Sequence, residues 1–260
     1  MGLREFNIFG RMKNILFIFL VFTFIKTSAQ SSFMDYQRNF PRVADALNRK
    51  ADTLKKQFAA AGLQWPAREI YIRSFKFDSQ LEVWVRNNAG EAFKLFKTYS
   101  VCALAGTLGP KRFQGDYQVP EGFYYINEFK PNSNYHMSLG INYPNPSDKI
   151  LNADDPGGDI YIHGSCVTVG CIPIQDPQIE ELYILAMSAK SSGQDFIPVH
   201  IFPIRFNNPK SVAYFDRTTK DDISVQQFAA ELKIVYEYFE KQKKLPIISI
   251  NSKGAYEIMN

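Results

Sequence analysis

The sequence predicts a mostly β domain with helices at both ends, which is an α+β fold class. Three observations support this prediction. Aromatic residues make up 15% of the 260 residues, with 22 Phe and 14 Tyr, and such side chains are enriched in strands. Apolar and polar residues alternate with a period of two from Glu69 onward. Helical spacing of apolar residues is clearest near the two ends, at residues 42–61 and 224–243.

The charge is concentrated at the N-terminus. The chain has 30 Lys and Arg against 26 Asp and Glu, and four of the cations lie within residues 1–29. The remainder carries a net charge of about +1, which argues against a nucleic-acid partner because phosphate binding needs a surplus of cations. The apolar runs are shorter than the roughly 18 residues of a spanning helix, so we expect no integral membrane domain.

Residues 1–29 have the pattern of a signal peptide. Arg11 and Lys13 precede an apolar run from Ile15 to Ile25, and small residues follow up to Ala29. A charged segment, a short apolar segment and small residues at the cleavage site are the three parts of such a signal. We therefore expect cleavage after Ala29 and export to the periplasm or cell envelope, with an uncleaved anchor as the alternative.

The rest of the chain divides into three parts. Residues 30–66 are predicted to be helical, with a helix over 42–61 that stops at Gly62. Residues 67–206 form the β domain, and residues 207–260 form a helical C-terminal extension that contains the helix over 224–243. Within the β domain, strands are predicted around residues 70–72, 81–85, 91–101, 122–126, 135–141, 160–162 and 199–202.

Two further segments connect these strands. Four glycines and two prolines between Gly106 and Gly122 predict a long ordered loop, and such loops are commonly functional. A helix is predicted from Asp176, which suits the N-cap position, through Pro177 at the first helical position to a stop at Gly193.

The chemistry is predicted to centre on His163 and Cys171. His163 ends a buried strand, and Cys171 follows eight residues later, directly after Gly170. An imidazole within hydrogen-bond reach of a thiol can take its proton and leave a reactive thiolate. Gly170 leaves room for a substrate carbonyl, and the amides of Gly170 and Cys171 are candidate donors to an oxyanion.

Other interpretations of the cysteines stay open at this stage. The chain has three, Cys102, Cys166 and Cys171, so an oxidising compartment leaves at least one thiol unpaired. A Cys166–Cys171 disulfide is sterically conceivable. His163, Cys166 and Cys171 could instead be zinc ligands, with His136 or His200 as the fourth, but their spacing matches no common zinc motif. We expect no metal and no cofactor.

At these residues the sequence resembles the YkuD-type L,D-transpeptidase catalytic domain, in its YafK-like murein branch. The resemblance lies in His163-Gly164 followed by Thr168-Val169-Gly170-Cys171. Supporting blocks in the same order are residues 108–124, 135–145 and 199–203. It covers about residues 68–206.

This resemblance implies a β-sandwich-like fold and a cysteine acyltransferase that acts on peptidoglycan stem peptides. Cys171 would be the nucleophile and His163 the base, oriented by a backbone carbonyl at the position of Gly164. An amine acceptor would make a cross-link or attach a protein to the wall, in cell-wall biogenesis, remodelling or cell shape. The alternatives are a hydrolase that cleaves an L,D or diamino-acid linkage, for instance to release a wall-attached protein, and a wall-binding domain without catalysis.

The sequence departs from the family at two positions. Val169 stands where the wider family usually has His, and Pro173 stands where it has Arg. The missing Arg removes a fixed cation that could bind a carboxylate. Thr168, His136 and Arg112 are the remaining candidates for substrate contacts, and Cys166 is expected to be a packing residue or a redox partner of Cys171.

Overall fold

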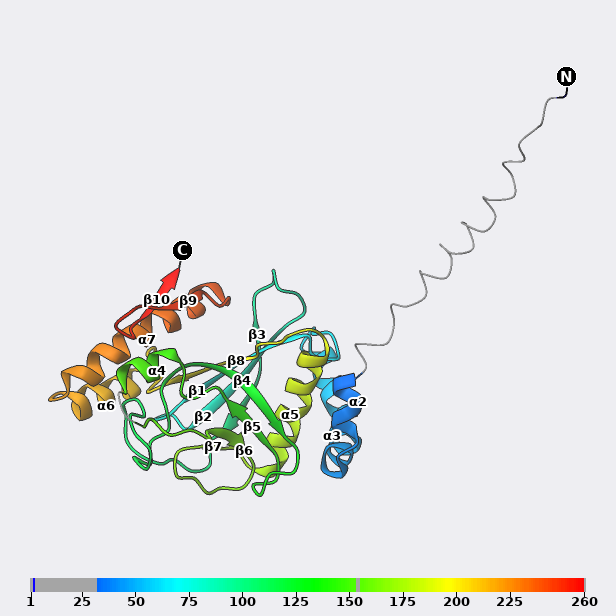
Figure 1. The fold of residues 1–260 in the computed structure, drawn as a ribbon, viewed down its shortest axis with the longest axis horizontal. Helices are drawn as coiled ribbons and strands as arrows, with labels where there is room; N and C mark the ends of the chain where they lie inside the picture. The colour runs from blue at the N-terminus through cyan, green and yellow to red at the C-terminus, as the bar shows by residue number, and fades with distance from the viewer. Residues whose placement is uncertain (1, 3–31, 153–154, 260) are drawn as a thin grey trace.

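The computed structural model describes residues 32–152 and 155–259, together with Gly2 (Figure 1). The signal peptide predicted at residues 1–29 lies outside this description, apart from that single glycine. None of the helices in the described ranges combines the length and the apolar character needed to cross a membrane.

The described residues begin with two helices and end with a strand hairpin, and strands predominate between them. Its helices are α2 (Ser32–Arg38), α3 (Pro41–Ala60), α4 (Pro146–Leu151), α5 (Asp176–Ser191), α6 (Pro209–Thr219) and α7 (Ile223–Gln242). Its strands are β1 (Glu69–Phe75), β2 (Gln80–Arg86), β3 (Lys94–Ser100), β4 (Gly122–Lys130), β5 (Ser138–Ile141), β6 (Tyr161–His163), β7 (Ile172–Pro173), β8 (Pro198–Phe202), β9 (Ile247–Ile250) and β10 (Tyr256–Met259).

Strands β1 to β8 form one mixed sheet, in the order β3-β2-β1-β8-β4-β5-β6-β7. The β1–β8 and β6–β7 pairs are parallel, and the others are antiparallel. The first half of β4 pairs with β8 and its second half with β5, so β4 joins the two halves of the sheet. The predicted α+β class is confirmed, with one continuous sheet as its core and β9 and β10 as a separate hairpin.

Helices lie on both sides of the sheet, with α2, α3 and α5 on one side and α6 and α7 on the other (Figure 1). Ile70 and Ile72 of β1 belong to the main core, which includes α5. Tyr71 points to the opposite face, where its ring lies 4.8 Å from that of Phe239 in α7. This double cover explains why β1 is buried along almost its whole length rather than at alternate residues.

Most predicted elements are present, but several short ones were missed. The helices over 42–61 and 224–243 are α3 and α7, each displaced by one residue. The unpredicted elements are α4, α6, β7 and the β9–β10 hairpin. The six residues of α4 are too few to show a period, although Asn145 and Asp148 form a capping box that could have indicated it.

The predicted N-cap of α5 is wrong. Gln175 occupies the N-cap position, and Asp176 is the first helical residue. The Asp176 carboxylate accepts a hydrogen bond from the backbone N–H of Ser165, at 2.8 Å. The side chain therefore stabilises a segment outside its own helix.

Asp148 makes the stability of the protein depend on pH. The side chain is buried, accepts hydrogen bonds from Tyr124 Oη at 3.1 Å and from the N–H of Asn145 at 3.0 Å, and has its pKa raised by burial to about 6. A carboxyl whose pKa is higher in the folded state adds to the free energy of unfolding when it is protonated. This stabilisation is fully present below its ordinary pKa of 3.8 and is lost as pH rises through 6.

We therefore expect Asp148→Asn to stabilise the protein at pH 7.5, by up to about 3 kcal/mol at 1.36 kcal/mol per pKa unit, and to have little effect at pH 4. Urea unfolding of both proteins at the two pH values measures this difference. An equal effect at both would show that Asp148 does not titrate between them.

Candidate active site

Cys171 directly precedes β7, at the point where β7 begins to pair with β6. The two strands are parallel, with His163 beside Pro173. The same register continued by one residue sets Cys171 next to Tyr161, whose backbone N–H donates to Sγ at 3.4 Å. The predicted nucleophile, directly before β7, and the predicted base, at the end of β6, therefore lie on adjacent segments, two residues apart in register.

Cys171 lines a cavity of about 450 Å³. The walls come from the glycine-rich loop that precedes β4, the turn that precedes β6 and the segment that ends at Cys171. The lining residues are Lys111, Gln114, Gly115, Tyr117, Asp155, Gly157, Gly158, Asp159, Ile160, Val169, Gly170 and Cys171. The other two cysteines are bonded to each other, so the one free thiol of the chain faces this cavity.

The glycine-rich loop is fixed by a buried lysine. Lys76 Nζ donates to the carbonyls of Gly109 at 2.8 Å and Val119 at 2.9 Å. It also forms an ion pair with Glu121 at 3.0 Å, and both side chains are almost fully buried. These contacts tie both ends of the loop to the residue that follows β1, so the loop forms a defined wall of the cavity.

His163 is buried at the end of β6. Its Nδ1 contacts the carbonyl oxygen of Gly164. Because a carbonyl can only accept a hydrogen bond, this contact places the proton of the neutral ring on Nδ1 and leaves Nε2 free to accept another. The ring of Tyr135 covers that of His163, with 4.8 Å between ring centroids.

Burial keeps both groups neutral in the resting structure. It raises the pKa of the Cys171 thiol above its ordinary value and lowers the pKa of His163 below its own. The described hydrogen bonds of Cys171 Sγ are to the backbone, with Tyr161 N–H and with Asp159 O at 3.6 Å. At neutral pH the structure therefore favours a neutral thiol and a neutral imidazole rather than an ion pair.

The raised pKa of Cys171 predicts how its alkylation rate depends on pH. We expect alkylation of Cys171 by iodoacetamide to accelerate continuously from pH 7 to above pH 9, because burial keeps the pKa of the thiol above 9.0. Mass spectrometry of the intact protein follows the single adduct, since the two bonded cysteines do not react. A rate that is already maximal below pH 7 would reveal a preformed thiolate and contradict this assignment.

The structure overturns the predicted role of the Gly170 amide. The Gly170 N–H donates to Thr168 Oγ1 at 3.0 Å, so it is not directed at a substrate. Thr168 Oγ1 in turn donates to the carbonyl of Cys171 at 2.8 Å. Gly170 is required for its backbone, which has φ +143 and lies where a Cβ would be 2.9 Å from the carbonyl oxygen of Gln118. Thr168 and Gly170 thus shape the turn before the nucleophile.

His136 and Arg112, the other predicted substrate contacts, lie outside the cavity lining. His136 Nε2 is hydrogen-bonded to Glu180 in α5, at 2.9 Å. The Arg112 guanidinium packs over the ring of Phe228 in α7, at 5.2 Å from its centroid. The neighbouring Lys111 lines the cavity instead, and its Nζ is paired with Asp116 at 2.5 Å.

Tyr117, Asp155 and Asp159 also line the cavity, although none of them was a predicted site residue. Each belongs to a segment that was interpreted only as a loop or a turn. The positions of these segments opposite Cys171 depend on tertiary packing, and only their richness in glycine hinted at a functional role.

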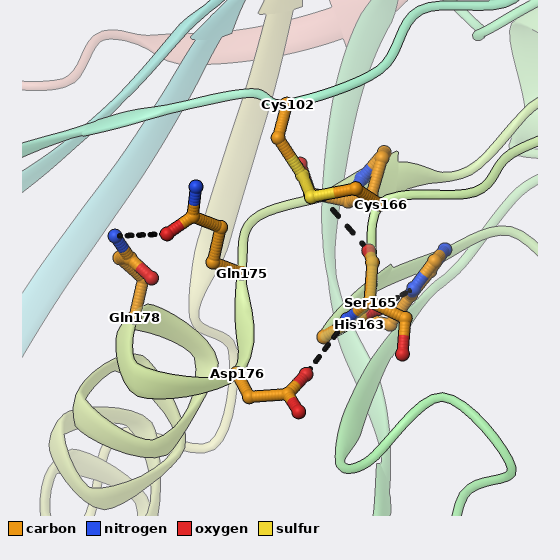
Figure 2. The surroundings of a disulfide bond; sticks show 9 residues. Cys102, His163, Ser165, Cys166, Gln175, Asp176 and Gln178 are labelled. Carbon is orange, nitrogen blue, oxygen red and sulfur yellow. Dashed lines mark hydrogen bonds between the residues drawn. A yellow bond between two sulfur atoms is a disulfide. The ribbon is translucent and has the colours of Figure 1, made fainter.

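Cys102 and Cys166 form a disulfide, with Cα atoms 5.5 Å apart (Figure 2). The expectation that Cys166 is a packing residue or a partner of Cys171 is therefore wrong. The disulfide also excludes the Cys166–Cys171 bridge, and it removes Cys166 from the proposed zinc ligands because its sulfur is no longer a thiolate. The covalent link joins the segment after β3 to the loop between β6 and β7, five residues before Cys171.

The chain is similar in sequence to known proteins. The sequence profile of the family described as "YkuD: L,D-transpeptidase catalytic domain" matches residues 78–201. The chain is 34% identical over 183 residues to the Escherichia coli K12 protein named "Putative L,D-transpeptidase YafK", and the matched region covers 70% of each chain. The O157:H7 protein of the same name gives the same values. The chain belongs to the YkuD L,D-transpeptidase catalytic domain family.

Solved structures show weaker similarity. The helical cell shape determining protein Pgp2 from Campylobacter jejuni is 19% identical, with a TM-score of 0.43 over 73% of this chain and 75% of that one. Bd1075 from Bdellovibrio bacteriovorus is 18% identical, with a TM-score of 0.39 over 72% and 79% of the two chains. The family assignment depends on neither of them.

Proposed function

We propose that this protein is an exported L,D-transpeptidase that acts on peptidoglycan stem peptides through a thioester on Cys171. The observation that carries the proposal is the free thiol in an open cavity, directly before the strand that pairs with the one ending in His163, whose Nδ1 faces a carbonyl. Membership of the family supplies the substrate class. Residues 67–206 are the proposed catalytic domain, with residues 30–66 as a helical N-terminal segment and residues 207–260 as a C-terminal extension that contains α6, α7 and the β9–β10 hairpin.

In the proposed reaction, substrate binding draws Sγ away from its backbone contacts, and Nε2 of His163 accepts its proton. The thiolate attacks the carbonyl of the third, diamino-acid residue of the stem peptide, and the Cys171 amide donates to the oxyanion. His163 then protonates the leaving nitrogen of D-Ala as the C–N bond breaks. An acceptor amine attacks the thioester, loses its proton through His163 and restores the thiol.

Export is supported by the disulfide as well as by the sequence. Structural disulfides persist in oxidising compartments and are rare in the cytosol. Cys102–Cys166 would form after transport, with residues 1–29 serving as the signal. We therefore place the enzyme in the periplasm or cell envelope, where its substrate lies.

Incubation of the purified protein with tetrapeptide muropeptides tests the proposal. Release of D-Ala together with cross-linked dimers is the expected result, and an intermediate that is heavier by one acyl group at Cys171 supports the thioester. Release of D-Ala with tripeptide monomers and no dimers would indicate hydrolysis instead. Unchanged muropeptides together with retention of the protein on sacculi would indicate a wall-binding domain.

A further inference from the structure

The peptide bond between Gly164 and Ser165 has a partner on each side. Its carbonyl oxygen faces Nδ1 of His163. Its N–H donates to Oδ1 of Asp176 at 2.8 Å. Because a trans peptide bond is planar, its C=O and N–H point in opposite directions. A carboxylate that holds the N–H therefore also fixes the direction of the carbonyl that holds the imidazole (Figure 2).

We propose that Asp176 is a positioning residue for His163 and acts through the peptide bond that joins Gly164 to Ser165. The proposal rests on the role of His163 as the base in the proposed function. It assigns to Asp176 the task that a directly bonded carboxylate performs in a Ser-His-Asp triad, with one peptide unit inserted between the two side chains.

The local backbone explains why this peptide needs a partner. Ser165 has φ +60, in the left-handed region that non-glycine residues rarely adopt. A Cβ on Gly164 would lie only 2.5 Å from Asp176 Oδ1 and 3.0 Å from the carbonyl oxygen of Tyr135. The turn is therefore closely packed, and the hydrogen bond to Asp176 offsets part of the cost of its conformation.

Asp176 is itself held by a fixed framework. It begins α5, so its backbone is anchored by the helix. Its second carboxylate oxygen lies 3.8 Å from Nδ1 of His136. His136 is hydrogen-bonded to Glu180, which pairs with Arg49 of α3 at 2.7 Å. Helix α3 is thus connected to the turn at Gly164 and Ser165 through these side chains.

The charge on Asp176 gives it an electronic effect as well. A carboxylate that accepts from an amide N–H polarises that amide, so its carbonyl oxygen becomes a better acceptor. The proton on Nδ1 is then held more firmly, and the positive charge that develops on His163 during thiol deprotonation is stabilised. The Asp176 side chain is 49% exposed, so solvent screens part of this effect.

Three variants test the proposal. Asp176→Asn keeps an oxygen that can accept from Ser165 but loses the charge, whereas Asp176→Ala loses both. Gln175→Ala is the matched control, because Gln175 is the adjacent residue and its side chain hydrogen-bonds to Gln178 rather than to the turn. Nitrogen-15 spectra of the imidazole rings report the tautomer and titration of His163, and they are tractable because the chain has only three histidines.

In Asp176→Asn we expect His163 to keep its Nδ1-protonated tautomer and to titrate at lower pH. The kcat/KM of this variant on muropeptides should fall about tenfold. In Asp176→Ala, kcat/KM should fall about 100-fold, and His163 should be a mixture of its two neutral tautomers. This agrees with the 10–100-fold effect of removing a partner that orients a functional side chain. Both losses should fall on kcat rather than KM.

If Asp176→Asn and Asp176→Ala both leave the tautomer and titration of His163 as they are in Gln175→Ala, the proposal is wrong. The spectra need no substrate, so they decide this point even if the wild-type protein turns over no muropeptide. If Asp176→Ala does not fold, the near-isosteric Asp176→Asn still decides it through the titration of His163.

Discussion

Replacing Cys171 with alanine is expected to abolish release of D-Ala, with a loss of more than about 10³-fold, as for removal of a covalent nucleophile elsewhere. Cys171 is the one cysteine outside the disulfide, and it lines the cavity. The described part of the chain offers no other free thiol there to form the thioester. Cys171→Ser should be nearly as inactive, because an alcohol is much harder to deprotonate than a thiol.

Val167→Ala is the matched control for this loss. Val167 lies in the same loop, is 56% exposed and does not line the cavity. We expect this variant to keep its activity and Cys171→Ala to keep the thermal stability of the wild type, since the Cys171 side chain makes only two long backbone hydrogen bonds, at 3.4 and 3.6 Å. Turnover by Cys171→Ala at a rate close to that of the wild type would refute the covalent mechanism.

The proposed nucleophile and base could be predicted from the sequence because both lie within one short segment. The eight-residue spacing from His163 to Cys171 limits how far apart the two residues can lie, and the parallel pairing of β6 with β7 then brings their segments side by side. The helices α3 and α7 were predictable for a similar reason, since each repeats its apolar residues over 20 positions.

The remaining features of the site depend on contacts between distant segments. The Lys76–Glu121 pair joins residues 45 positions apart, and no local pattern indicates it. Asp176 looked like an ordinary N-cap, since a carboxylate at the start of a helix usually serves that helix. Its bond to Ser165 becomes visible only once α5 is packed against the turn. Sequence predicts such residues by type, whereas the fold decides what they contact.

The disulfide is the clearest example, and it leads to the second large effect. Three cysteines allow three pairings, and the observed one closes a loop of 64 residues. A crosslink of that span is expected to stabilise the folded state by about 4 kcal/mol, through the lost entropy of the unfolded chain. We expect the double variant Cys102→Ser/Cys166→Ser to lose roughly this much free energy of unfolding, measured by urea denaturation.

The single variants should behave differently from the double one. Cys102→Ser leaves Cys166 unpaired, five residues before Cys171 and on the same loop. An oxidant can then join those two sulfurs, so this variant should lose activity in air and regain it with dithiothreitol. The double variant has no second thiol and should be insensitive to both reagents.

This comparison separates two roles of the bond. If the disulfide serves only stability, the double variant should retain the kcat of the wild type at temperatures well below its unfolding transition. If it also fixes the loop that carries Cys171, kcat should fall even where the protein is fully folded. We expect the second result, because the disulfide and the Cys102 N–H bond to the Pro173 carbonyl together hold the segment after β3 against both sides of Cys171, and the double variant loses the covalent half of this link. Unchanged stability in the double variant would contradict the assigned pairing itself.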